Sequence, residues 1–453
     1  MASSALLIRV IAGDMAARPL ALFITYYFPP SGGPGVQRVL KFVKYLPEFG
    51  WEPVVLTVRQ GAYPSRDPSL EGELGAGLRI YRTPSWDQFA LYARWTGKRP
   101  DEAATVGFAS TKPPDWRERW ARWIRANCFL PDARLGWVPF AIRAGRQILR
   151  QLPVRVLVTS GPPHSTHLIG RALHRRFHLP WVADFRDPWT GIDYYAELPM
   201  SRWARRLDAA LERAVLREAS AVVTVGPSMA RHLQERYSRF YHVIPNGFDE
   251  SDFPSPAADP EPGSAFRLLY VGTLNPARNP EILWEALRRL RAEGIRLELE
   301  LVGLIDGLVR ERLAQLGLLG DLVRVRAYVP HEEAVRLMCG ADGLLLLINR
   351  SPGAEGILTG KIYEYLASGR PVLGIGPPEG DAALVLRQSG AGVMVHWDDL
   401  EGLIDHLRAF YEAWRSGRPI RGASREAALR YSRRMLAGEL VLLLDSVLQR
   451  CGS

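Results

Sequence analysis

Short apolar runs alternate with amphipathic segments along most of this 453-residue chain, and that alternation constrains its fold more than any other feature. Strands that are joined through helices run parallel, and a parallel sheet is covered by helices on both faces. The pattern therefore predicts an α/β protein. The apolar runs of the first half are residues 21–27, 53–58, 154–160, 181–185 and 221–226.

The alternation is interrupted at residues 242–266, where Pro-Asn-Gly is followed by a stretch rich in Pro, Ala, Asp, Glu and Ser. Such a stretch is typical of a domain boundary. A second series follows, and a chain of this length is too long for one core. We therefore expect two doubly wound, Rossmann-like domains. The expected divisions are an N-terminal extension (1–19), a first domain (20–250), a second domain (265–425) and a terminal helix (426–453).

Hydropathy, the N-terminal residues and the cysteines indicate in which cell compartment the protein is expected. No run of 18 or more apolar residues occurs, so the sequence predicts no membrane span. The first 20 residues lack a basic segment and contain Arg9 and Asp14, unlike a signal peptide; Met15 is a second candidate start. Three widely spaced cysteines form neither a disulfide framework nor a zinc pattern. We expect a cytoplasmic protein.

Positive charge is concentrated in the first half. Residues 1–250 hold 34 Lys and Arg against 22 Asp and Glu, a net charge of +12, whereas the whole chain has +10. The remainder therefore has a net charge of −2. A basic half of this kind attracts phosphates, anionic lipid or nucleic acid. The alternative is that the charge serves only solubility, and no nucleic-acid motif accompanies it.

Two strand-loop-helix segments are candidate ligand loops. In residues 26–38, Gly32, Gly33 and Gly35 allow close approach of the backbone, and the following helix start offers free N–H groups to an anion. In residues 270–283, Arg278 sits in the loop, where it could grip a phosphate with two donors. The alternatives are an ordinary turn and a surface arginine.

The segment 356–376 is the most informative. Gly360 opens a short helix and Gly369 ends it. Lys361 and Glu364 lie one turn apart on one face. A lysine at a helix start can hold a diphosphate, and the carboxylate can accept both hydroxyls of a ribose. The alternative is an ordinary Lys–Glu pair within a helix.

Charged residues follow the apolar run 181–185. Asp184, Arg186 and Asp187 crowd the end of a buried strand, and buried charge is costly unless it is paired or used. The segment is therefore either an active site or a salt-bridged strand end. His164 and His167 lie where another loop becomes a helix, and they are candidates for an acceptor site or for helix-end histidines.

Residues 115–137 predict an amphipathic helix of unusual composition. Trp116, Trp120 and Trp123 fall on one face, and four arginines lie mostly off it. Tryptophans flanked by arginines suit an anionic membrane surface. The alternative is a peripheral helix with its tryptophans packed inward.

Together and in this order, these motifs resemble the retaining GT-B glycosyltransferases of the family-4 type over residues 20–440. The resemblance is greatest to bacterial members with Y-F-P-P-x-G-G-x-G near the start and D-F-R-D-P-W in mid-chain. It implies that the two domains face across a cleft and that the terminal helix (426–453) could cross back to the first domain. The donor it implies is a nucleotide-sugar, UDP- or GDP-linked, held mainly by the second domain. It also implies a saccharide or lipid-linked acceptor held by the first, for cell-surface polysaccharide or glycolipid synthesis. No cofactor and no metal are expected.

The resemblance also assigns residues. Glu364 matches the glutamate that binds the donor ribose, and Arg278 with Lys361 is assigned to the diphosphate. Gly272-Thr273 stands where relatives have Gly-Arg, and the family's first glutamate falls on Gly356, next to Glu355. The expected donor-binding set is completed by Gly32, Gly33, Gly35, Pro330 and Gly360, with Pro330 in the segment 328–333 that would hold the nucleobase through its backbone.

On the acceptor side, Arg186 falls at the position of the family's histidine that faces the reacting sugar. We expect Asp187 to be the carboxylate nearest the acceptor hydroxyl, Arg186 and Asp184 to form a positioning pair, and His164 to lie in the same site. Two other functions remain open on the sequence: a non-catalytic binder of nucleotide-sugars, and a sugar-nucleotide epimerase.

Overall fold

The computed structural model describes residues 18–61, 63, 65–86, 116–192, 195, 197–253 and 264–452. The chain divides into two compact units. The first contains the described residues up to Val225, Met229–Pro245 and the chain from Leu436; the second contains Gly226–Ser228 and Asn246–Met435. Each unit is built on one parallel sheet with helices on both faces, so the expected α/β class with two doubly wound domains is confirmed.

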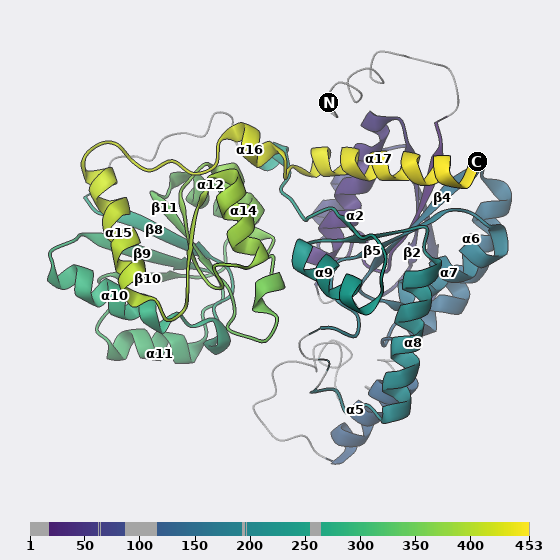
Figure 1. Ribbon diagram of the computed structural model, residues 1–453, viewed down its shortest axis with the longest axis horizontal. Coiled ribbons are helices and arrows are strands. Elements are labelled where there is room, and N and C mark those ends of the chain that lie inside the picture. Colours follow the sequence, from purple (N-terminus) through teal and green to yellow (C-terminus); the bar gives the residue numbers. More distant parts are fainter. Residues whose placement is uncertain are drawn as a thin grey trace. The chain divides into compact units, whose positions relative to one another are not determined.

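The first unit has a seven-stranded sheet in the order β3-β2-β1-β4-β5-β6-β7. Helices surround this sheet (Figure 1). Every neighbouring pair is parallel. Its strands are β1 (Leu20–Ile24), β2 (Glu52–Val58), β3 (Arg79–Thr83), β4 (Val154–Gly161), β5 (Trp181–Phe185), β6 (Ala221–Thr224) and β7 (His242–Val243).

Alternate residues of these strands enter two apolar cores. Leu22 of β1 packs into a core formed with α6 (Val138–Gln151), α7 (Ser165–Phe177), α8 (Arg202–Glu218) and α9 (Pro227–Arg236). Phe23 packs into the opposite core, formed with α2 (Pro34–Tyr45) and α17 (Arg433–Gly452). The residues of α17 from Leu436 onward therefore cover the first sheet.

The second unit has a six-stranded parallel sheet in the order β10-β9-β8-β11-β12-β13. Helices α10, α11 and α15 cover one face, and α12, α13, α14 and α16 cover the other. Its elements are β8 (Phe266–Val271), α10 (Glu281–Ala292), β9 (Leu297–Val302), α11 (Gly307–Gln315), β10 (Val323–Arg326), α12 (His331–Gly340), β11 (Gly343–Leu347), α13 (Lys361–Ser368), β12 (Val372–Ile375), α14 (Asp381–Ser389), β13 (Gly392–Val395), α15 (Leu400–Arg415) and α16 (Arg425–Leu429).

Two strands of the first sheet have no counterpart among the apolar runs. β3 is half-buried along most of its length and carries Arg79 and Arg82, and β7 is only two residues long. Edge strands need not be apolar on both faces, so periodicity alone does not reveal them. Among the described residues, no helix combines the length and apolar character needed to cross a bilayer.

Candidate functional site

In the second unit, the strand order reverses between β8 and β11, which are neighbours in the sheet. In open α/β sheets, ligands bind outside the carboxyl ends of strands at such a switch point. β8 is followed by Gly272 and the loop that holds Arg278, and β11 is followed by Asn349. The Nε of Arg278 donates to Oδ1 of Asn349 at 2.6 Å, so the two loops are joined directly.

Tyr270, near the end of β8, holds the two predicted cations together. The Nζ of Lys361 lies 3.3 Å from the Tyr270 hydroxyl and 4.7 Å from the centre of its ring. The Nη1 of Arg278 donates to the same hydroxyl at 3.4 Å and to the carbonyl of Thr273 at 3.1 Å. The hydroxyl in turn donates to the carbonyl of Thr273 at 2.7 Å. Sequence reasoning did not single out Tyr270.

The two cations destabilise each other. Burial, together with the nearby Arg278 and against the opposing effect of Glu364, lowers the pKa of Lys361 to about 8. A half-buried ammonium beside a guanidinium gains free energy when an anion neutralises it. The expected pairing of Arg278 with Lys361 around a diphosphate is therefore compatible with the geometry, and remains a prediction.

Two glycines make room for this cluster. Gly272 has φ +135°, and a Cβ on it would lie 1.9 Å from Nζ of Lys361. Gly303, which follows β9, has φ +125°, and its Cβ would lie 2.5 Å from the carbonyl oxygen of Gly272. Only glycine combines these φ angles with such close approaches.

Glu364 lies one turn after Lys361 on α13. Its pKa is raised, mainly by burial, with Asp252 acting in the same direction and His331 opposing it. Within the described residues its carboxylate has neither a hydrogen bond nor an ion pair. Thr359, just before the helix, also has a buried hydroxyl oxygen without a partner. A half-buried carboxylate without donors loses part of its hydration, and two hydroxyls of a ligand would satisfy it.

The other residues expected around the donor either begin a helix or are exposed. Gly360 is the N-cap residue of α13, and Pro330 is the N-cap residue of α12. Thr273 is exposed, as is Glu355 in the short helical turn Ala354–Gly356. The role of Glu355 stays open.

In the first unit, the strand order reverses between β1 and β4. Arg186, which follows β5, joins the loops at this point. Its guanidinium donates to the carbonyls of Gly161 (3.2 Å), Pro162 and Gly35. The side chain is buried, and burial lowers its pKa, opposed by Asp187 and Asp184. Arg186 therefore links the end of β4 to the start of α2 through their backbone carbonyls.

The glycine-rich loop of residues 26–38 offers a ligand less space than expected. A Cβ on Gly32 would lie 2.9 Å from Oγ of Ser65, and one on Gly35 would lie 3.1 Å from Nη1 of Arg186. These two glycines accommodate neighbouring protein atoms. Gly33 is different: it is exposed, has φ +90° and is the N-cap residue of α2. Of the three, Gly33 is the glycine at which a ligand could approach the backbone.

The expected pairing of Asp184 with Arg186 is wrong. Asp184 is buried and pairs with Arg38 of α2, with 2.8 Å between Nη2 and Oδ1, and it accepts a hydrogen bond from Ser160 at 2.7 Å. Arg38 also donates to the carbonyls of Ile244 and Pro245 at 2.8 Å. Arg38 comes from a helix 146 positions away, and nothing in its local sequence marks it as the partner. Asp184 is thus the salt-bridged strand end that the sequence left as an alternative.

Asp187 has the opposite environment. It is exposed, unlike Asp184 and Arg186, and precedes Pro188 and the buried Trp189. It is the carboxylate of this segment that a solvent-borne hydroxyl can reach. Its expected role beside the acceptor remains a prediction.

His164 and His167 are stacked in an aromatic cluster. The ring of His167 lies 4.4 Å from Phe185, and that of His164 lies 5.0 Å from Trp189. Burial lowers the pKa of His167 to about 3 and holds that of His164 well below its usual value, with Arg186 acting in the same direction on both. Both imidazoles are therefore neutral near pH 7.

The hydroxyl of Thr159 links two rings of this region. It accepts a hydrogen bond from Nε1–H of Trp181 at 2.8 Å and shares a second one with Nδ1 of His167, also at 2.8 Å. The other ring nitrogen of His167, Nε2, is buried without a partner among the described residues, as is Nδ1 of His164. Buried polar atoms usually have a hydrogen-bond partner, so these two nitrogens are exceptional.

Comparison with known families assigns the class of protein. Residues 32–247 match the family described as Glycosyl transferase 4-like domain, and residues 265–413 match the family described as Glycosyl transferases group 1. With two doubly wound units, the chain is a glycosyltransferase of the GT-B type. A comparison with curated protein sequences gives no match.

Solved structures share the fold at low sequence identity. Sucrose-phosphate synthase from Thermosynechococcus elongatus has a TM-score of 0.60 and 15% identity, covering 96% of this chain and 100% of its own. HepE from Anabaena, in complex with UDP, has a TM-score of 0.61 and 15% identity, covering 94% and 99%. The lipopolysaccharide outer core galactosyltransferase WaaB has a TM-score of 0.56 and 11% identity, covering 94% and 99%.

Proposed function

We propose that this protein moves a sugar from a nucleotide-sugar donor to a hydroxyl of a saccharide or lipid-linked acceptor, with retention of the anomeric configuration. The product would serve cell-surface polysaccharide or glycolipid synthesis. The protein would act in the cytoplasm with peripheral contact to an anionic membrane. The second unit would hold the donor and the first the acceptor.

The observation that carries this proposal is the cluster of Lys361, Arg278 and Glu364 at the switch point of the second sheet. Cleavage of the sugar–phosphate bond leaves negative charge on the diphosphate. Two fixed cations and the N-terminus of α13 can stabilise that charge. Glu364, which lacks donors among the described residues, would accept hydrogen bonds from the ribose hydroxyls. In the described part of the chain, no three His, Cys, Asp or Glu side chains are placed to hold a metal together. We therefore propose metal-independent transfer.

On the acceptor side, we propose that Asp187 lies nearest the attacking hydroxyl and assists its deprotonation. Arg186 would act through the backbone of the loops it joins, as a positioning residue. His164 would lie in the same site, and its buried, neutral ring, like that of His167, would add no positive charge there.

For the donor, we propose a UDP-sugar ahead of a GDP-sugar. The support is the likeness of fold to HepE, which has been solved with UDP and with UDP and glucose. The segment around Pro330 would hold the base through its backbone.

The test is a thermal-shift screen with UDP-, GDP- and dTDP-sugars, followed by a donor-hydrolysis assay on wild type and on Glu364→Ala. Losing the hydrogen bonds of a charged acceptor costs about 1.5–3 kcal/mol, so Glu364→Ala should weaken donor binding about 10- to 100-fold. Glu426→Ala, on the exposed surface of α16, is the matched control and should bind as wild type does.

Each outcome distinguishes one function from another. Donor hydrolysis above background that Glu364→Ala removes supports the transferase. Donor binding without turnover, with any acceptor tried, would mean a non-catalytic binder. Conversion of one nucleotide-sugar into its epimer would mean an epimerase.

A further inference from the structure

The tryptophans of α5 (Trp116–Cys128) face away from the apolar core. Trp116, Trp120 and Trp123 are 60%, 56% and 44% exposed, and the rings of Trp120 and Trp123 pack edge to face at 5.8 Å. The sequence allowed either outward tryptophans or a helix with its tryptophans packed inward. The structure excludes the second alternative.

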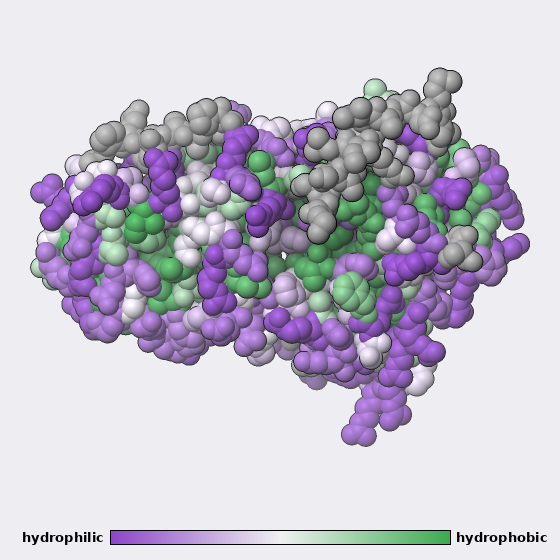
Figure 2. Space-filling view, turned by 45° about the horizontal axis from the view of Figure 1, so that its top comes forward, coloured by the Kyte–Doolittle hydropathy of each residue, from purple (hydrophilic) through white to green (hydrophobic). Residues whose placement is uncertain are grey.

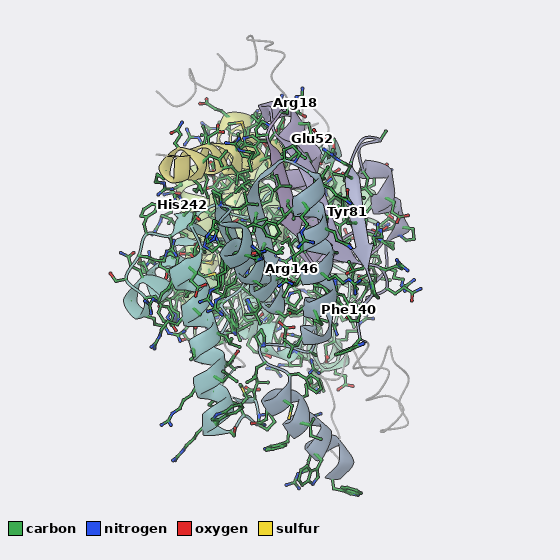
Figure 3. The ribbon with its side chains drawn as sticks, turned by 90° about the vertical axis from the view of Figure 1, so that its right-hand side faces the viewer. Arg18, Glu52, Tyr81, Phe140, Arg146 and His242 are labelled. Carbon is green, nitrogen blue, oxygen red and sulfur yellow. The ribbon has the colours of Figure 1, made fainter. Side chains whose placement is uncertain are left out.

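The N-terminal end of α8 extends this exposed apolar surface. The side chain of Asn127 donates to the carbonyl of Pro199 at 2.9 Å and accepts from the N–H of Ser201 at 2.7 Å, which joins the end of α5 to the start of α8. Trp203 and Leu207, just beyond, are 68% and 37% exposed. Figure 3 shows the two helices at the lower end of the first unit with side chains extending away from it.

Arginines accompany these apolar side chains. Arg119 and Arg122 lie on α5, and Arg202 and Arg206 on α8; within the described ranges none of the four forms a hydrogen bond or an ion pair. A shallow hollow on α5, lined by the three tryptophans, Arg119 and Arg122, includes one carboxylate, that of Glu197. Figure 2 shows strongly hydrophilic residues over this projecting part of the molecule.

We propose that these residues form the surface through which the protein docks on an anionic lipid bilayer. The Trp/Arg surface consists of Trp116, Trp120, Trp123, Trp203 and Leu207 with Arg119, Arg122, Arg202 and Arg206. The inference extends the peripheral membrane contact of the proposed function and rests on it for its biological purpose. Docking itself requires only the exposure and the charge of these side chains.

A bilayer surface satisfies both kinds of side chain at once. Tryptophan rings prefer the boundary between headgroups and acyl chains, and arginines gain free energy from anionic headgroups. Exposed clusters of large aromatic side chains are otherwise unfavourable in water. An acidic protein partner would satisfy the arginines, but it would not need several separate rings around the end of a projecting helix pair.

The experiment is vesicle flotation of the full chain without any donor. Vesicles of phosphatidylcholine alone are compared with vesicles containing 30% phosphatidylglycerol, at low salt and at 0.5 M NaCl. We expect binding to the anionic vesicles at low salt, a loss of at least tenfold in 0.5 M NaCl, and no binding to the neutral vesicles.

Two double variants separate the contribution of the arginines to vesicle binding from that of the tryptophans. Arg119→Gln/Arg122→Gln should weaken binding about 25-fold, since each arginine near an anionic surface contributes about fivefold. Trp120→Ala/Trp123→Ala should weaken it at least tenfold. The matched controls lie toward the other end of α8, where Arg213 and Arg217 line one hollow with Phe240. At 1.5 Å per residue, these two arginines are roughly 15–20 Å along the helix from Trp203. The control variants are Phe240→Ala (73% exposed in wild type) and the exposed pair Arg213→Gln/Arg217→Gln, and they should bind within twofold of wild type.

The proposal is overturned if wild type ignores the anionic vesicles, if it binds neutral vesicles equally well, or if the controls lose as much binding as the Trp/Arg variants. Should a tryptophan variant fail to fold, the arginine pair and the lipid dependence of wild type still decide. Donor binding in the thermal-shift screen is measured separately. A protein that binds vesicles but no nucleotide-sugar would therefore contradict the proposed function and leave the docking surface standing.

Discussion

A Cβ on Gly272 would lie 1.9 Å from the ammonium nitrogen of Lys361, so the backbone after β8 and the lysine at the start of α13 occupy space that only a glycine leaves available. The two residues are 89 positions apart. The same lysine lies 3.3 Å from the hydroxyl of Tyr270, two residues before the glycine. The position of the ammonium group is therefore set from both sides by the end of one strand.

Gly272→Ala should damage donor binding more than its size suggests. The new methyl group requires an unfavourable φ of +135° and displaces Lys361. We expect at least a tenfold loss of donor affinity, measured by calorimetry, and a free energy of unfolding lowered by about 1–3 kcal/mol. Gly307→Ala, at the start of α11 where nothing lies within 4 Å of the added carbon, is the control and should bind normally. Equal affinities for the two variants would contradict the arrangement.

Donor affinity should fall as the pH rises above 8. Lys361 has a pKa of about 8 in the free protein, so it increasingly loses the charge that binds the diphosphate. Affinity measured by calorimetry should decline toward tenfold per pH unit between pH 8 and 9.5. Lys361→Met should bind about 10- to 100-fold more weakly at pH 7 and lack this decline.

Lys361 should make the free energy of unfolding rise over the pH range in which donor affinity falls. The folded-state pKa of Lys361 lies below its ordinary value of 10.5. Between pH 8 and 10.5 the unfolded chain therefore binds more protons at this residue, and the lysine contributes a rise in the free energy of unfolding with pH. Comparison of urea unfolding in wild type and Lys361→Met isolates that contribution. A wild-type slope that equals the slope of the variant would mean that Lys361 titrates normally.

Asp184→Asn and Asp187→Asn should have different effects. Asp184→Asn leaves the buried guanidinium of Arg38 without its counter-charge, which typically costs about 3–5 kcal/mol of stability. Asp187→Asn changes an exposed residue, so stability should stay within about 0.5 kcal/mol while sugar transfer falls at least tenfold. Urea unfolding and a transfer assay on both variants provide the comparison. Full activity of a folded Asp187→Asn protein would remove Asp187 from the proposed mechanism.

His167 should remain neutral in mildly acidic solution. With a pKa of about 3, its ring signals in NMR spectra should keep their neutral positions from pH 8 down to pH 5. His167→Gln identifies the signal. A titration midpoint between pH 6 and 7 would show that the ring is exposed to water, contrary to its stacking on Phe185.

Much of the donor site could be predicted because its residues share short segments. Lys361 and Glu364 are three positions apart, so helix geometry alone puts them on one face. Arg278 was placed in the same site by its loop and by resemblance to a family. Tyr270 and Asn349, which hold the cations in place, carried no local signal, because a tyrosine near a strand end and an asparagine in a loop are common.

The first unit shows more clearly which features could not be predicted from the sequence alone. The charge at the end of β5 required a partner, and Arg186, two positions from Asp184, was the expected one, yet Arg38, 146 positions away, supplies it. Likewise, the helical spacing of Trp116, Trp120 and Trp123 placed them on one face without saying whether that face is inside or outside. Whether that face is buried depends on which element packs against it in the folded protein.

The sequence by itself determined the alternation of strands and helices, the division into two α/β units and the residue types at the strand ends, because these follow from local periodicity and turn chemistry. Only the tertiary structure decided that Asp184 is neutralised by Arg38 while Asp187 is exposed, that Gly35 accommodates Arg186, and that the tryptophans of α5 face solvent. Partners, burial and pKa depend on atoms that are brought together from distant parts of the chain, and no local pattern encodes those distances.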